Sequence, residues 1–162
     1  MMETQKTSPK RRKNKMSTYK SVFKRYEKKY MLTIGQYEDL MQILQERMTR
    51  DAFGLHTISN IYFDTERFDL IRTSIEKPIY KEKLRVRSYR VPQDADNVFI
   101  ELKKKFNGEV FKRRVQMTLE ESKKYLMLGE KPTESSQIVN EIDWFLKSYQ
   151  PVPKVFIAYD RQ

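Results

Sequence analysis

An Asn-Gly pair at residues 107 and 108 constrains the fold of this chain more than any other feature of its sequence. The pair joins two runs of strand-forming residues, NVFIELKKKF at 97–106 and EVFKRRVQM at 109–117. An Asn-Gly pair between two such runs favours a two-residue hairpin, because both turn positions take positive φ. The sequence therefore predicts an antiparallel sheet built around this hairpin.

Another strand is predicted at 81–90, in the stretch KEKLRVRSYR. Successive side chains of a strand point to opposite faces, so Lys83, Arg85 and Arg87 share one face and apolar side chains share the other. A rise of about 3.3 Å per residue places Arg85 and Arg87 about 6.6 Å apart, where like charges repel by roughly 2.5 kcal/mol at an effective dielectric of about 20. Either water screens this face or an anion occupies it.

The remaining elements complete an α+β pattern in which helices flank the sheet. Further strands are predicted at 21–32, 56–65 and 154–162, a short helical turn within 66–75, and helices after Thr33, after Thr118 and at 134–149. Thr33 with Gln36 and Thr118 with Glu121 have the spacing of capping boxes. The first helix has an apolar stripe that we expect in the core: Tyr37, Leu40, Met41, Leu44 and Met48.

Charge and composition limit the classes of function. The formal charge is +11, and residues 1–20 hold seven Lys or Arg against one acidic residue. We expect 1–18 to be a disordered basic tail and 19–162 to form one domain. The chain has no Cys and one His, which excludes a thiolate nucleophile, disulfides and a Cys/His zinc site.

The sequence also lacks several localisation and phosphate-binding signals. It contains no apolar run long enough for a membrane span and no signal peptide, which predicts a cytoplasmic protein. Its four glycines are isolated, so no glycine-rich phosphate loop is present. If the chain binds phosphate, side chains must do so.

Strand parity places most of the charged residues on one side of the sheet. The charged faces are Arg25, Glu27 and Lys29; Lys83, Arg85 and Arg87; Glu101 and Lys103; and Lys112 and Arg114. A solvated face normally mixes both signs of charge, whereas basic residues predominate here. An inward-facing basic groove explains this better, and a polyanion such as a phosphate chain is its natural occupant.

Six short segments resemble one known family. The segments YEKKYML, SNIYFDT, KLRVRSY, IELKKK, GEVFKRRV and AYDR occur in this order in the chain. In order and spacing they resemble the vacuolar transporter chaperone (VTC) domain, the polyphosphate polymerase branch of the triphosphate tunnel metalloenzymes, within the CYTH-like superfamily. The resemblance runs from about residue 20 to the last residue. It implies an antiparallel β-barrel tunnel that binds ATP and polyphosphate, uses Mn²⁺ or Mg²⁺, and transfers the terminal phosphoryl group of ATP to a polyphosphate chain.

The resemblance also implies which residues bind phosphate and metal. The positions that match basic residues of the family are Lys29, Arg85, Arg87, Lys103, Lys112 and Arg161. Parity adds Arg114, Lys83 and Arg25, and the candidate metal ligands are Glu27 and Glu101. The related hydrolase branch has two Glu residues two positions apart on its first strand, where this chain has Arg25 and Glu27. That difference weakens the case for a metal-binding first strand.

The family continues beyond the YDR strand with further strands and an acidic metal ligand, whereas this chain ends at Gln162. On this basis we expect a C-terminally truncated, incomplete tunnel with an open edge that favours self-association. Three alternatives to polyphosphate synthesis remain. One is a module that binds polyphosphate, inositol phosphates or nucleotides without turnover. The others are a triphosphatase, which the missing Glu pair disfavours, and a nucleic-acid binder, which lacks the aromatic and glycine pattern of RNA-binding platforms.

Overall fold

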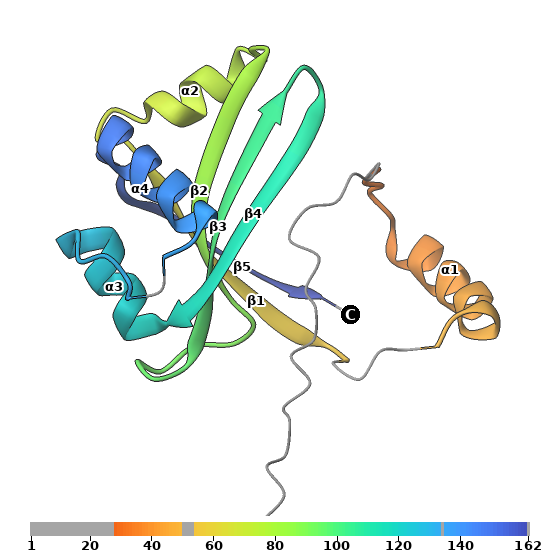
Figure 1. The fold of residues 1–162 in the computed structure, drawn as a ribbon. Coiled ribbons are helices and arrows are strands. Elements are labelled where there is room, and N and C mark those ends of the chain that lie inside the picture. The colour runs from red at the N-terminus through yellow and green to blue at the C-terminus, as the bar shows by residue number, and fades with distance from the viewer. Residues whose placement is uncertain (1–27, 50–53, 134, 162) are drawn as a thin grey trace, which may run out of the picture.

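The computed structural model describes residues 28–49, 54–133 and 135–161, which form an α+β fold (Figure 1). The described helices are α1 (Ile34–Arg47), α2 (Asp69–Ile75), α3 (Leu119–Leu128) and α4 (Gln137–Tyr149). The described strands are β1 (His56–Asp64), β2 (Tyr80–Ser88), β3 (Asn97–Phe106), β4 (Glu109–Thr118) and β5 (Val152–Arg161). The basic tail predicted at 1–18 lies outside the described residues.

The five strands form one antiparallel sheet in the order β4-β3-β2-β1-β5. The predicted hairpin is confirmed: Phe106 pairs with Glu109, and Asn107 and Gly108 have φ values of 45° and 84°. Strands β4 and β5 are the two edges, so the described sheet does not close into a barrel. The expected fold, an incomplete antiparallel barrel with flanking helices, is therefore confirmed.

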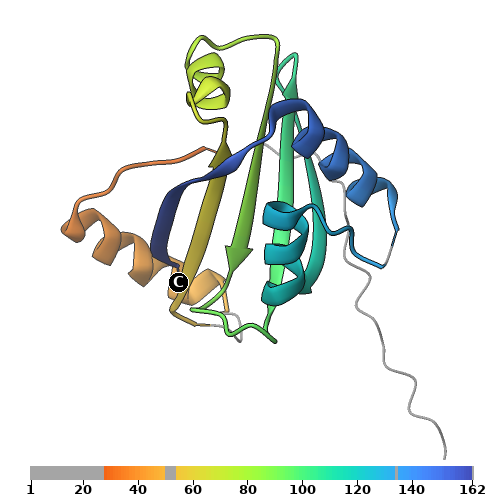
Figure 2. The same ribbon diagram turned by 90° about the vertical axis from the view of Figure 1, so that its left-hand side faces the viewer.

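The hydrophobic core lies on one face of the sheet, where α3 and α4 pack (Figures 1 and 2). Alternate residues of β3 point into it, and Val98, Ile100 and Leu102 are fully buried. Burying one such side chain stabilises the fold by about 1.5–3 kcal/mol, so this stripe determines which face the helices cover. Tyr125 of α3 is also buried, and its hydroxyl donates a hydrogen bond to the carbonyl of Val139 at 3.0 Å.

Local signals at the helix ends behave as the sequence predicts. Thr33 and Thr118 both form capping boxes, with Gln36 and Glu121 respectively. Helix α3 is followed by the C-cap residue Gly129, which has a φ of 74°. Left-handed backbone of this kind costs glycine little, because it has no Cβ.

Two predictions about the N-terminal part of the chain are wrong. The apolar stripe of α1 is not in the core: no residue of α1 is buried, and Leu40 is 40% exposed. Figure 1 shows α1 apart from the sheet, on the side opposite α3 and α4. Helical periodicity shows that a helix has an apolar face, but not which surface covers that face.

The strand predicted at 21–32 is also absent from its described part. Residues 28–33 form neither helix nor strand, and residues 21–27 lie outside the described residues. Alternation alone does not make a strand, because a strand needs a neighbour to pair its backbone donors and acceptors. Among the described helices, none has the length and apolar composition that crossing a membrane requires.

Candidate functional site

Charged side chains line the face of the sheet that α3 and α4 do not cover. Cross-strand pairing places Lys83 beside Lys103, and Lys103 beside Lys112. The next row consists of Arg85, Glu101 and Arg114, so the in-register arrangement predicted for these strands is confirmed. We call this surface the basic face and define it by seven residues: Lys83, Arg85, Arg87, Glu101, Lys103, Lys112 and Arg114.

Glu101 lies at the centre of the basic face and is only 1% exposed. Arg85 donates to its Oε2 from Nε at 2.8 Å and from Nη2 at 2.5 Å. Arg114 donates to Oε1 from Nε at 2.7 Å, and its Nη2 contacts the same oxygen. The Lys112 ammonium lies 3.0 Å from Oε1, and Arg87 Nε lies 4.0 Å from Oε2. Four cations therefore surround one carboxylate.

This arrangement shifts the pKa values of the groups involved. Burial would raise the pKa of Glu101, but Arg85, Arg87, Lys112 and the hydrogen bond from Arg114 outweigh it and lower that pKa to about 2. Desolvation lowers the pKa of Lys112, and Glu101 offsets this effect only in part. Burial likewise opposes the charge of Arg85, yet Glu101 and Tyr62 raise its pKa. Glu101 is therefore ionised at neutral pH and holds the cations in place.

Strand β1 supplies polar partners that the sequence analysis did not single out. The Tyr62 hydroxyl accepts a hydrogen bond from Arg85 Nη1 at 2.8 Å. Asn60 is buried, and its Oδ1 accepts from Arg87 Nε at 2.9 Å. Both residues have the same parity in the strand predicted at 56–65, and that shared parity was the available signal. These contacts fix the orientation of two guanidinium groups.

Aromatic side chains lie at the end of the basic face that is nearer the β2–β3 turn. The Arg114 guanidinium lies 4.4 Å from the centre of the Phe99 ring, and its Nη2 donates to the Tyr89 hydroxyl at 3.3 Å. Tyr89 in turn packs edge-on against Phe99, with ring centroids 5.6 Å apart. Arg114 is thus held by a carboxylate on one side and by aromatic rings on the other.

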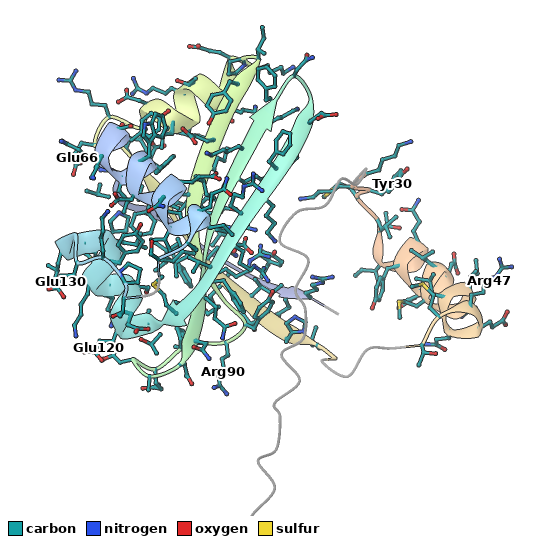
Figure 3. The ribbon with its side chains drawn as sticks, viewed as in Figure 1. Tyr30, Arg47, Glu66, Arg90, Glu120 and Glu130 are labelled. Carbon is teal, nitrogen blue, oxygen red and sulfur yellow. The ribbon has the colours of Figure 1, made fainter. Side chains whose placement is uncertain are left out.

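Positive charge on the basic face exceeds what Glu101 neutralises. The face has six cationic side chains and one carboxylate, which leaves five uncompensated positive charges. Figure 3 shows Glu66, Glu120 and Glu130 on the helix-covered side of the molecule. An excess of ordered cations on one face attracts polyanions.

The other predicted site residues do not join this cluster. Arg161 pairs with His56, at the end of β1 farthest from the paired position of Tyr62 and Arg85. Lys29 precedes α1 and lies outside the sheet. Arg25 and Glu27 lie outside the described residues.

The described residues do not fit a metal ion held by protein carboxylates. Both oxygens of Glu101 already accept hydrogen bonds from guanidinium groups. In the described parts of the chain, no three His, Cys, Asp or Glu side chains lie close enough together to hold a metal. Mg²⁺ and Mn²⁺ favour several oxygen ligands, which Glu101 alone does not provide.

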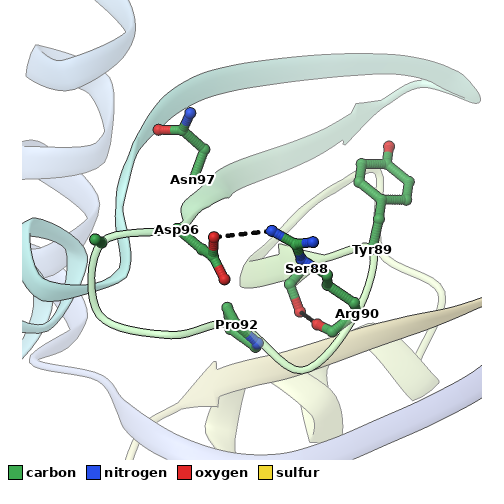
Figure 4. A pocket seen from close by; sticks show the side chains of 7 residues that line it. Ser88, Tyr89, Arg90, Pro92, Asp96 and Asn97 are labelled. Carbon is green, nitrogen blue, oxygen red and sulfur yellow. Dashed lines mark hydrogen bonds and ion pairs between the residues drawn. The ribbon is translucent and has the colours of Figure 1, made fainter.

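A cavity of about 290 Å³ lies at the turn between β2 and β3, beyond the aromatic end of the basic face (Figure 4). Tyr89, Pro92 and Asn97 line it, and an ion pair between Arg90 and Asp96 at 2.9 Å crosses one side. Arg90 is largely exposed and is already paired, so the cavity adds little positive charge to the basic face.

Several solved chains match this fold, and one of them is a putative adenylate cyclase from Bacillus halodurans. Its crystal structure superposes with a TM-score of 0.52 at 16% sequence identity. The match covers 80% of this chain and 60% of the other, so this chain spans less than two thirds of that protein. At this identity the likeness shows the fold alone. No curated protein sequence matches the chain.

The family comparison covers most of the chain. The model of the VTC domain matches residues 24–162, which include every described strand. The matched region also contains all seven residues of the basic face, so the resemblance of the short charged strands extends over the whole sheet. The chain therefore belongs to the VTC domain family.

Proposed function

We propose that the basic face binds the phosphate chain of ATP or of inorganic polyphosphate, and that the domain is of the polyphosphate polymerase type. In that reaction the terminal phosphoryl group of ATP is transferred to a growing polyphosphate chain. The observation that carries the proposal is the cluster around Glu101, where four cations are held in place with positive charge in excess. Membership of the VTC family supports the choice of polyphosphate as the product.

The chemistry of phosphoryl transfer suits such a face. The reaction depends on aligning the phosphate groups and neutralising their charge more than on covalent catalysis by the protein. Arginine is well suited to this task, because its planar fork can bind two non-bridging oxygens at once. Glu101 keeps Arg85 and Arg114 oriented before substrate arrives, which reduces the cost of reorganisation on binding.

A second candidate is a module that binds phosphate chains without turnover. Both oxygens of Glu101 accept hydrogen bonds from arginines, so the described face offers no carboxylate for a metal. This observation favours the binding module. Incubating the protein with ATP and Mn²⁺ separates the two candidates. The polymerase proposal requires new polyphosphate chains, whereas the binding module gives saturable binding without chains.

Titration calorimetry with tripolyphosphate tests the binding step common to both candidates. The test variant is Arg85→Gln/Lys103→Gln, and the control is Lys124→Gln/Lys147→Gln, which removes equal charge from exposed helix positions. Each lost charge-assisted hydrogen bond costs about 1.5–3 kcal/mol. We therefore expect the test variant to bind at least about tenfold more weakly.

The control should bind tripolyphosphate within about twofold of the wild type, because surface ion pairs contribute little. Circular dichroism of the test variant checks that it still folds. Equal affinities of a folded test variant and the wild type would refute binding at the basic face.

A further inference from the structure

A second group of cations extends the basic face toward α2 and the β3–β4 hairpin. Lys81 pairs with Lys105 across β2 and β3, in the row that follows Lys83 and Lys103. Lys77, which follows α2, acts electrostatically on Lys81. We call this group the lysine rim and define it by three residues, Lys77, Lys81 and Lys105, which lie next to Lys83 and Lys103 of the basic face.

The lysine rim continues the basic face in a straight line along β2. Lys81, Lys83 and Arg85 have the same parity, so they lie on one face at intervals of about 6.6 Å. Cβ atoms of directly paired residues lie about 4.5–5.5 Å apart across the strands. The rim therefore places several ammonium groups within reach of one extended chain that also contacts Arg85.

Local hydrogen bonds hold this end of the sheet in shape. The backbone N–H of Asn107 donates to the carbonyl of Ile79 at 2.9 Å and ties the hairpin to the start of β2. Lys81 Nζ donates to the carbonyl of Ser74 at 2.8 Å, near the C-terminus of α2. Rim lysines thus project from a fixed framework.

The rim lysines carry charge that the described residues do not neutralise. Lys105 of the rim and the neighbouring Lys83 and Lys103 of the basic face form no ion pair in the described parts of the chain. Desolvation lowers the pKa of Lys81, and the neighbouring lysines, Lys105 first, lower it further. By parity, Glu82 and Glu109 lie on the opposite face of the sheet, so they do not relieve this repulsion. A bound anion relieves it.

We propose that the lysine rim binds the part of a linear polyphosphate chain that extends beyond the phosphates held around Arg85 and Arg114. The chain then runs along β2 from Arg87 toward Lys81 and leaves the site between α2 and the hairpin. This inference rests on the proposed function, and it adds a binding region, formed by Lys77, Lys81 and Lys105, and a direction for the chain.

The chemistry of the rim favours inorganic polyphosphate over nucleic acid. Proteins that bind single-stranded nucleic acid combine a basic groove with aromatic side chains on which bases stack. In the rows of Lys81 and Lys83 no described aromatic residue shares the basic face, since Tyr80, Phe106 and Phe111 have the opposite parity. Tyr89 and Phe99 lie at the far end of the face. Inorganic polyphosphate, which has a negative charge on each phosphate and no bases, matches this surface.

The test compares tripolyphosphate with long-chain polyphosphate in binding to Lys81→Gln/Lys105→Gln. The control is again Lys124→Gln/Lys147→Gln. We expect the rim variant to bind tripolyphosphate within about twofold of the wild type and long-chain polyphosphate at least about tenfold more weakly. The slope of log affinity against log salt should fall by roughly one to two units, because each neutralised phosphate releases counterions. Lys105→Gln alone breaks no described hydrogen bond, and it should also lower the affinity for long-chain polyphosphate.

The possible negative results distinguish a failure of the lysine rim from a failure of the proposed function. Unchanged long-chain affinity in a variant that still binds tripolyphosphate would overturn the rim and leave the proposed function intact. A wild-type protein that binds neither polyphosphate would overturn both. If single-stranded RNA bound the wild type more tightly than long-chain polyphosphate and lost as much affinity in the rim variant, the assignment of inorganic polyphosphate would be wrong.

Discussion

Glu101 is a buried carboxylate whose charge is balanced by cations on the two neighbouring strands. Arg85 comes from β2, Lys112 and Arg114 come from β4, and Glu101 itself lies on β3 between them. Moving a carboxylate out of water is unfavourable unless it is paired and hydrogen-bonded, and here both oxygens are satisfied. Glu101 is therefore the residue on which the order of the basic face depends.

Replacing Glu101 tests this role through stability. Glu101→Gln leaves the surrounding cations uncompensated, and we expect it to lower the free energy of unfolding by about 3–5 kcal/mol. Denaturant unfolding at neutral pH measures the change. The control is Glu130→Gln, an exposed position after α3 that we expect to alter stability by less than about 0.5 kcal/mol.

The effect of Glu101→Gln on the free energy of unfolding should depend on pH. Folding lowers the pKa of Glu101 from 4.5 to about 2, so its stabilisation is complete above pH 4.5 and is lost as the pH falls toward 2. A shift of this size corresponds to about 3 kcal/mol. The stability difference between wild type and Glu101→Gln should therefore shrink over this range. A difference that stays constant would contradict the account.

Much of the basic face could be predicted from single residues, because strand parity is strict. Alternation alone places Lys83, Arg85 and Arg87 on one face, and their register with β3 and β4 follows from the Asn-Gly hairpin and the neighbouring strand. The role of Glu101 as the shared partner of four cations was not predicted. Which cation contacts which oxygen depends on side-chain conformations, and sequence does not encode these as a simple period.

At the scale of elements, α1 and the sheet contribute differently to stability. Ile43 of α1 is 53% exposed, whereas Ile100 of β3 is fully buried. We expect Ile43→Ala to change the free energy of unfolding by less than about 0.5 kcal/mol and Ile100→Ala to lower it by about 2–5 kcal/mol. Chemical denaturation of both variants makes the comparison.

A large cost for Ile43→Ala would show that the stripe of α1 is covered in solution, as the sequence suggested. Leu40→Ala is a second variant on the same helix and should behave like Ile43→Ala, because Leu40 is also partly exposed. Alanine has the highest helix propensity, so a loss of stability at either position reports lost packing and not a weaker helix.

Predictions at this scale succeeded where the signal is local and failed where it depends on a partner. Capping boxes at Thr33 and Thr118 and the turn at Gly108 need only neighbouring residues, and all three are present. The described part of the predicted strand, 28–32, and the burial of α1 both require another part of the structure to pair or pack against them. The periodicity of apolar residues shows that an element needs such a partner, but it does not show where that partner lies.

The whole molecule has two unlike faces. Helices α3 and α4 cover the apolar face of the sheet, and the cations lie on the other face (Figures 1 and 2). The described strands form an open sheet with β4 and β5 as its edges, so they do not enclose the cationic face.

A crystal structure of the protein with bound tripolyphosphate is the most direct test of phosphate binding at the basic face. We predict phosphate oxygens within hydrogen-bonding distance of Arg85, Arg114 and Lys103, on the side of the sheet away from α3 and α4. Phosphates bound only over the helices or at the cavity near Arg90, with the basic face empty, would contradict the central claim.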